Sequence, residues 1–121
     1  MKKIAVSSEG PMLDDMVDSR FGRAGGFLIV DPDTMTGEYI DNGATQTMSQ
    51  GAGIQAAEIV ATAGAGVVLS GYVGPKAFTA LTSVGIQVGQ NCEEMTVREA
   101  VSKFMDGKIP LADKPNREAG V

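Results

Sequence analysis

The second half of the chain alternates helix-type segments with short apolar runs, and this alternation constrains the fold more than any other feature. Between residues 54 and 63, the polar side chains recur at a spacing that puts them on one face of a helix. Residues 66–70 form a short apolar run of the kind found in buried parallel strands. A second helical stripe covers residues 75–84, and residues 86–89 give another short strand. The pattern predicts parallel strands joined by crossover helices.

The last expected helix has the clearest boundaries. Thr96-Val97-Arg98-Glu99 has the form of a capping box, in which the Thr and Glu side chains bond N–H groups at the start of the helix. Apolar residues follow at helical spacing as far as Met105, and Gly107 suits the C-terminal cap. Residues 108–121 carry prolines, charges and few apolar side chains, so we expect a single domain over residues 1–107 and then a flexible C-terminal tail.

The first half of the chain favours antiparallel strands. Residues 3–7 and 26–31 are apolar runs rich in β-forming side chains. Turn residues then lead into a short strand over residues 38–41, as in a hairpin. We therefore predict an α/β fold in which three antiparallel strands precede the parallel strands, with residues 67–70 central and buried and with helices on both faces of the sheet.

The residue inventory excludes several classes of chemistry. The chain has no His and one Cys, so Ser-His-Asp and Cys-His catalysis, disulfides and all-Cys zinc sites are impossible. Its net charge of −5 argues against a nucleic-acid-binding protein, because phosphate backbones require a basic face. No apolar stretch suits a signal peptide or a membrane span, so we expect a cytoplasmic protein.

A Gly-rich turn is the first candidate site. Ser70-Gly71-Tyr72-Val73-Gly74-Pro75-Lys76 follows a predicted parallel strand and enters a helix. Backbone N–H groups and the positive end of the helix dipole converge at such a turn, and Lys76 adds a full positive charge. The motif is neither a Walker A loop nor GxGxxG, so nucleotide binding has little support. A plain strand-to-helix turn with closely packed glycines explains the same residues.

A loop with two arginines is the second candidate. Arg20 and Arg23 lie around Phe21 and Gly22, just before the strand predicted at residues 26–31. Arginine offers planar, permanently charged donors that suit oxyanions and other polyanions, and Asp18 is placed to hold one of the two. A solvated loop whose charges pair locally is the alternative interpretation.

Sulfur-bearing and acidic side chains are the remaining candidates. Thioether and thiolate sulfurs bind Cu(I) and other soft metals, although methionine more commonly fills gaps in the core. The cysteine precedes two glutamates, and their negative charge raises a thiol pKa, so a reactive nucleophile is not expected. Carboxylates around Mg²⁺ would suit a nuclease, but turn chemistry and loop solvation explain these acids better. The sulfur set is Met12, Met16, Met48 and Cys92, and the acidic set is Glu9, Asp14, Asp15, Asp18, Asp31 and Asp41.

Four motifs resemble a known family and occur in the family's order. They are the FGRA loop at residues 18–24, the strand and G-x-x-G-P-x-A turn at 67–77, the GI-x-V strand at 85–88 and the TVxEA helix at 96–101. Together they span nearly the whole predicted domain, from about residue 3 to residue 107. On these motifs the chain resembles the dinitrogenase iron–molybdenum cofactor biosynthesis proteins, the NifX and NifB C-terminal-like accessory factors.

The resemblance implies a ribonuclease-H-like α/β fold with a five-stranded mixed sheet. It also implies a non-catalytic protein that binds or carries a preformed metal–sulfur cluster, of the molybdenum–copper sulfide or iron–molybdenum-cofactor precursor type, held noncovalently. Some members ligate the cluster through His, which this chain lacks, so we expect an anionic thiometallate held by charge, amide N–H groups and apolar contact. The residues that the resemblance places around the cluster are Ser19, Arg20, Phe21, Arg23, Gly71, Gly74 and Lys76.

A second hypothesis assigns the same loops to a cofactor-free interaction module that docks partner ATPases or cofactor-assembly proteins. The colour and metal content of the isolated protein distinguish the two hypotheses. A third, an enzyme acting on an anion or a nucleotide, is disfavoured because the chain lacks a His base.

Overall fold

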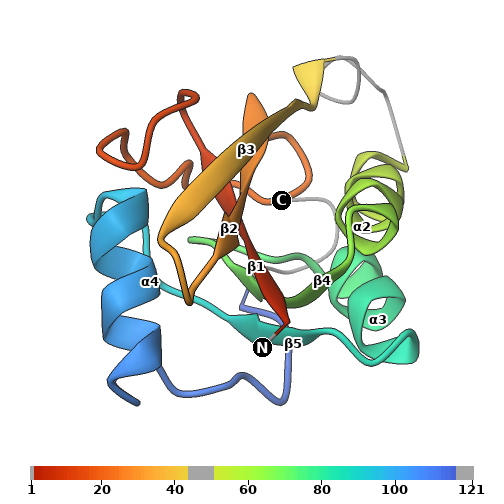
Figure 1. The fold of residues 1–121 in the computed structure, drawn as a ribbon. Coiled ribbons are helices and arrows are strands. Elements are labelled where there is room, and N and C mark those ends of the chain that lie inside the picture. The colour runs from red at the N-terminus through yellow and green to blue at the C-terminus, as the bar shows by residue number, and fades with distance from the viewer. Residues whose placement is uncertain (1, 44–50, 117–121) are drawn as a thin grey trace.

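The computed structural model describes residues 2–43 and 51–116, and within them one mixed sheet has the strand order β3-β2-β1-β4-β5 (Figure 1). The β1–β2 and β2–β3 pairs are antiparallel, whereas the β1–β4 and β4–β5 pairs are parallel. The predicted α/β fold with a five-stranded mixed sheet is thus confirmed for the described residues, while its ribonuclease-H-like classification stays a prediction. The strands are β1 (Lys3–Ser8), β2 (Gly26–Asp31), β3 (Thr36–Asp41), β4 (Ala65–Leu69) and β5 (Gln87–Gly89).

Helices cover both faces of the sheet, as predicted. Figure 1 shows α2 (Ala52–Thr62) and α3 (Pro75–Ser83) on one face and α4 (Val97–Met105) on the other. Because side chains alternate along a strand, β1 serves both faces: Ala5 packs with α2 and α3, whereas Ile4 packs with α4. Among the described residues, no helix is long and apolar enough to cross a membrane.

The centre of the sheet differs from the prediction. The sequence favours residues 67–70 as the central strand, but β1 takes the centre because it pairs with both β2 and β4. β4 lies beside it and is buried as expected, with Val68 and Leu69 fully inaccessible. β1 takes the central position because it pairs with antiparallel β2 on one side and with parallel β4 on the other.

The two caps predicted for the last helix lie at the ends of α4. The Thr96 hydroxyl accepts a hydrogen bond from the Glu99 backbone N–H at 3.1 Å, and the Glu99 carboxylate accepts one from the Thr96 N–H at 3.0 Å. This is the capping box expected for α4. Gly107 follows α4 with a φ of 73°, a conformation that residues with a side chain rarely adopt.

The described part of the segment after α4 has contacts with the sheet. Ile109 is buried, and the Ala112 N–H donates a 2.8 Å hydrogen bond to the Val88 carbonyl of β5. Leu111 also forms a bridge with Gly89. Residues 109–112 therefore lie against β5, whose outer edge would otherwise offer unpaired backbone groups. The division of the chain into a domain over residues 1–107 and a tail stays a prediction.

Candidate functional site

Both candidate loops lie at the same end of the strands. The arginine loop comes just before β2, and the Gly-rich turn follows β4. The parallel neighbours β1 and β4 end there, and the chain leaves β1 toward β2 on one side and β4 toward α3 and β5 on the other. In open α/β sheets, ligands usually bind outside the carboxyl ends of the strands at such a reversal. We call residues 18–23 the arginine loop and residues 70–74 the glycine turn.

Backbone hydrogen bonds join the arginine loop to the glycine turn. The Tyr72 N–H donates to the Ser19 carbonyl at 2.6 Å, and the Phe21 N–H donates to the Tyr72 carbonyl at 3.0 Å. Arg20 and Tyr72 consequently pair as an isolated parallel bridge. The structure thus makes one unit of two motifs that are about fifty residues apart in the sequence.

Gly71 allows the two loops to approach. A Cβ on Gly71 would lie 2.5 Å from the Ser19 carbonyl oxygen and 2.9 Å from the Ser19 Cα, which is too close for any side chain. Gly74 differs, because a Cβ there would meet nothing within 4 Å. Gly71 is therefore required by packing, whereas Gly74 borders open space at the start of α3.

Asp18 organises the backbone of the arginine loop. Its nearly buried carboxylate accepts hydrogen bonds from the Arg20 N–H at 3.0 Å and the Gly25 N–H at 3.3 Å. The Arg20 Nε lies 3.8 Å from Asp18 Oδ1, a long ion pair, and the Arg20 side chain stays 56% exposed. Asp18 thus fixes the loop conformation and leaves the Arg20 guanidinium at the surface.

The first turns of α2 and α3 lie beside the arginine loop. A Cβ on Gly22 would lie 3.0 Å from the Gly53 Cα in α2, and a Cβ on Gly53 would lie 2.9 Å from the Ala77 Cβ in α3. Within the described part of the chain, neither first turn holds an acidic residue or a side-chain cap. The positive ends of two helix dipoles therefore lie near the backbone of the arginine loop, and exposed Lys76 is in the first turn of α3.

The Gly22–Gly53–Ala77 contact could not be predicted from the sequence. Small residues leave no periodic signal, and the only indication was the high glycine content around both loops. Arg23 follows Gly22 directly and is partly buried with interactions of its own. Ser19 contributes its backbone carbonyl to the unit.

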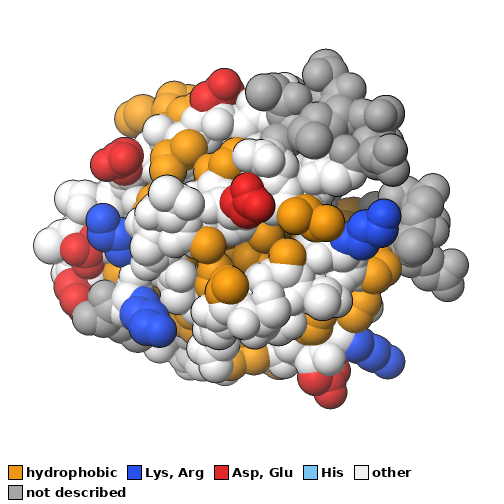
Figure 2. Space-filling view, turned by 90° about the vertical axis from the view of Figure 1, so that its right-hand side faces the viewer, with side chains coloured by type: hydrophobic (Ala, Val, Ile, Leu, Met, Phe, Trp, Pro, Cys, Tyr) orange, Lys and Arg blue, Asp and Glu red, His pale blue; other side chains and the backbone are white. Residues whose placement is uncertain are grey.

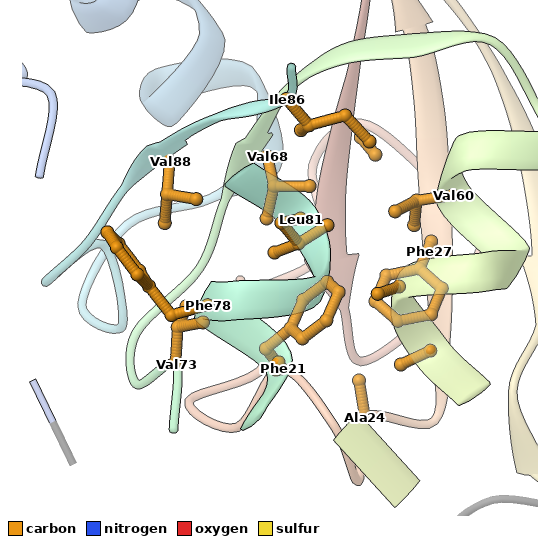
Figure 3. Close-up of a cluster of buried hydrophobic side chains, with 14 of the residues drawn as sticks. Phe21, Ala24, Phe27, Val60, Val68, Val73, Phe78, Leu81, Ile86 and Val88 are labelled. Atoms are coloured by element: carbon orange, nitrogen blue, oxygen red, sulfur yellow. The ribbon is translucent and has the colours of Figure 1, made fainter. Parts of the chain in front are cut away.

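Phe21 lies away from the surface on which the resemblance places the cluster. Its side chain is fully buried, with its ring centroid 5.2 Å from that of Phe27. Figure 3 shows the ring inside the core beneath α2 and α3, close to Leu81. Phe21 anchors the arginine loop to the core, and contact with a ligand would require the ring to leave it.

Cys92 is unsuited to ligation in this conformation. The side chain is fully buried in the core on the α4 side of the sheet. Burial, and after it the charge of Glu93, raises the pKa of the Cys92 thiol to about 11. The expected direction is confirmed, although burial outweighs the neighbouring glutamates as the cause. At neutral pH the sulfur is a protonated thiol, which is a poor nucleophile and a poor metal ligand.

The two other described sulfur candidates lie at the surface. Met12 is 65% exposed and Met16 is 40% exposed, so neither fills the core, and Met48 lies outside the described residues. Across residues 2–43 and 51–116 there is no group of three or more His, Cys, Asp or Glu side chains that could hold a metal ion.

Several of the acidic residues accept hydrogen bonds, two of them from nearby backbone N–H groups. A hydrogen bond from the Arg98 Nε at 2.9 Å lowers the pKa of Asp14 below its ordinary value. The Asp15 carboxylate accepts a 2.8 Å hydrogen bond from the Met12 N–H, and Asp31 accepts one from the Asp33 N–H in its turn. The turn chemistry predicted for these acids is confirmed at Asp31.

An open groove adjoins Lys76 on the α2–α3 face. Its volume is about 400 Å³, and Figure 2 shows apolar side chains gathered over the middle of this face. The groove lies between the two helices, so it could not be inferred from either helix alone. Its lining residues are Ile54, Pro75, Lys76, Thr79, Ala80 and Ser83.

Comparison with known proteins decides the family. The family model described as dinitrogenase iron-molybdenum cofactor matches residues 1–107 of the chain. The chain belongs to the dinitrogenase iron-molybdenum cofactor family. The resemblance indicated by the four sequence motifs is thereby confirmed, and the arginine loop and the glycine turn both lie inside the matched region.

Solved structures similar to this chain share its fold, and a further relative is similar in sequence. The apo form of the orange protein (ORP) from Desulfovibrio gigas is 61% identical, with a TM-score of 0.94 over 97% of this chain and 98% of that one. A "putative NifB protein" from Thermotoga is 29% identical, with a TM-score of 0.82 over the same shares of the two chains. An uncharacterised protein from Methanocaldococcus jannaschii is 28% identical over 102 residues, 82% of this chain and 85% of that protein. The four sequence motifs also resemble those of the orange protein, and the 61% identity confirms this resemblance.

Proposed function

We propose that this chain is a non-catalytic protein that binds or carries a preformed metal–sulfur cluster. The cargo is a molybdenum–copper sulfide or an iron–molybdenum-cofactor precursor, held noncovalently at the arginine loop, the glycine turn and the start of α3. The observation that carries the proposal is the Ser19–Tyr72–Phe21 backbone ladder, which joins the arginine loop to the glycine turn at the carboxyl ends of β1 and β4. Family membership supports it, as does the likeness to a protein described in an apo form, the counterpart of a loaded form.

The charge distribution favours an anionic cargo. The chain carries a net charge of −5, yet Arg20 and Arg23 flank Gly22, which approaches the first turn of α2, and Lys76 lies in the first turn of α3. Guanidinium groups are weakly hydrated and pair well with large anions of diffuse charge, such as thiometallates. Each charge-assisted hydrogen bond contributes on the order of 1.5–3 kcal/mol, so a few such contacts are enough for tight binding.

The donor set fits a noncovalently held cluster better than one with protein ligands. The chain has no His, and Cys92 is buried with a pKa of about 11. Charge and backbone N–H groups supply the attraction, while the apolar groove beside Lys76 supplies contact area.

The α2–α3 face favours a second candidate, a cofactor-free module that docks a partner ATPase or cofactor-assembly protein. Ile54 is 43% exposed and Val84 is 62% exposed on or beside these helices, and large exposed apolar side chains are common at protein interfaces. In either role we propose that the protein works in the cytoplasm.

The metal content of the protein tests the first candidate against the second. The protein is purified without oxygen, analysed for molybdenum, copper and sulfide, and then titrated with tetrathiomolybdate and Cu(I) while its visible absorption is followed. We expect a saturable visible chromophore with a fixed metal ratio, and no uptake of molybdate, an oxyanion without sulfide, under the same conditions. A colourless, metal-free protein that binds neither reagent would contradict cluster carriage and favour the docking module.

A further inference from the structure

The side chain of Asn116 is bonded into the glycine turn from far along the chain. Its Oδ1 accepts a 2.9 Å hydrogen bond from the Val73 N–H, and its Nδ2 donates a 2.9 Å hydrogen bond to the Gly71 carbonyl. Nδ2 also lies 3.2 Å from the Asn91 Oδ1, in the loop between β5 and α4. One carboxamide therefore pairs with both an N–H and a carbonyl of the turn, as a neighbouring strand would.

Asn116 completes a set of contacts that surround the glycine turn. The arginine loop bonds Tyr72 on one side, while the Asn91 N–H donates to the Gly71 carbonyl at 3.0 Å on another. Asn116 supplies the acceptor for the Val73 N–H, which precedes the start of α3. Removing the carboxamide takes that acceptor away, and a part-buried N–H without a partner is costly.

The segment that carries Asn116 is itself fixed in place. Ile109 is buried, the Ala112 N–H bonds the Val88 carbonyl, and the Gln90 Nε2 donates a 3.1 Å hydrogen bond to the Lys114 carbonyl. Asn116 therefore reaches the turn from a backbone that already lies along β5.

We propose that Asn116 is a positioning residue for the cluster site, an inference that rests on the function proposed above. It holds Gly71 and Val73 in the conformation that sets the first turn of α3 beside the arginine loop. Cluster affinity then depends on a side chain in the C-terminal segment, and release of this segment would lower that affinity.

The test compares Asn116→Ala with a matched control, Gln90→Ala. The control removes a side-chain hydrogen bond between the same segment and the end of β5, but it leaves the turn untouched. Tetrathiomolybdate with Cu(I) is titrated into both variants and the wild-type protein, and amide hydrogen exchange is measured at Val73 and at Val68. We expect Asn116→Ala to bind about tenfold more weakly, the order expected for the loss of two ordinary hydrogen bonds, with faster exchange at Val73 and unchanged exchange at Val68. Gln90→Ala should stay within about twofold of the wild-type affinity.

The possible results distinguish a failure of the positioning role from a failure of the proposed cluster-binding function. Wild-type affinity in Asn116→Ala, or equal losses of affinity in both variants, would overturn the positioning role while the proposed function stands. Absence of binding by the wild-type protein would overturn both. If Asn116→Ala fails to fold, Asn116→Gln serves instead: it keeps the neutral carboxamide but moves it one methylene away from the Val73 N–H and the Gly71 carbonyl, and it should weaken binding as well.

Discussion

Gly71 and Gly74 lie three residues apart in the glycine turn and have different roles. A methyl group on Gly71 would collide with the backbone of Ser19, whereas one on Gly74 would meet open space. Gly71→Ala should therefore lower the free energy of unfolding by about 1–3 kcal/mol, the cost of overpacking, and weaken cluster binding by separating the two loops. Urea unfolding and the thiometallate titration measure the two effects.

Gly74→Ala is the matched control for this prediction. Its φ of −74° suits any residue, so its stability should stay close to that of the wild-type protein. Equal destabilisation by the two substitutions would show that the close approach of Gly71 to Ser19 does not hold the loops together.

The buried thiol of Cys92 predicts a pH dependence of stability. Its pKa rises from 9.0 to about 11 on folding, so between these values the unfolded chain binds fewer protons than the folded one. The free energy of unfolding should therefore fall as the pH rises from 9.0 to about 11. Urea unfolding at several pH values checks this slope.

A substitution isolates the part of the slope that belongs to the thiol. Burial also raises the pKa of Tyr39, which contributes a loss of stability in the same direction. Cys92→Ala should therefore flatten the slope without abolishing it. An unchanged slope in Cys92→Ala would mean that the thiol ionises as easily in the folded protein as in the unfolded chain.

For single residues, the sequence indicates the charges of the candidate site better than its packing. The two arginines and Lys76 are ordinary donors for an anion, so the sequence pointed to them directly. The burial of Phe21 could not be predicted from the sequence, because a single aromatic residue in a polar loop has no periodic apolar pattern around it. The contact between Gly71 and Ser19 depends on tertiary structure alone.

Among the elements, α4 offers the clearest test of local stability. Thr96→Ala removes the hydroxyl that accepts the Glu99 N–H, and loss of such a cap costs about 1 kcal/mol. The urea midpoint should fall accordingly. Thr79→Ala, at an exposed position inside α3, is the control and should change stability by less than about 0.5 kcal/mol. A wild-type midpoint for Thr96→Ala would show that the capping box contributes nothing.

Helices and strands with a strong apolar pattern can be predicted from the sequence. The contacts of the irregular segment 108–116 cannot. The strands at residues 3–8 and 26–31 and helix α4 have continuous or periodic apolar signals. The segment 108–116 has one buried apolar anchor, Ile109, and otherwise depends on backbone bonds and on Asn116. The prolines and charged residues of this segment are typical of a flexible chain terminus, and they predict no contacts with the sheet.

For the whole molecule, the order of elements was sufficient to predict the layers. Crossovers between parallel strands and short links between antiparallel ones allow few arrangements, and one with helices on both faces is observed. The position of β1 at the centre could not be predicted from apolar content, because β1 contains Lys3, Ser7 and Ser8 whereas β4 contains only small and apolar residues. The same topology brings the carboxyl ends of these two strands together, and we propose that the arginine loop and Lys76 concentrate positive charge there in an otherwise acidic protein.

The central claim is that this concentrated charge holds an anionic cluster, and a titration of charge variants tests it most directly. Arg20, Arg23 and Lys76 are replaced together by Gln, and tetrathiomolybdate with Cu(I) is titrated at low and high salt. A control variant replaces the exposed residues Lys3, Lys103 and Lys108, which removes the same total charge at other places on the fold. Cys92→Ser is titrated alongside them.

The account predicts that the site variant loses about three or more orders of magnitude in affinity, since each charge-assisted contact is worth on the order of 1.5–3 kcal/mol. The remote variant and Cys92→Ser should keep most of the wild-type affinity, and added salt should weaken wild-type binding. If the site variant still assembles the chromophore and Cys92→Ser abolishes it, the cluster is held by a thiolate and the anion site is contradicted.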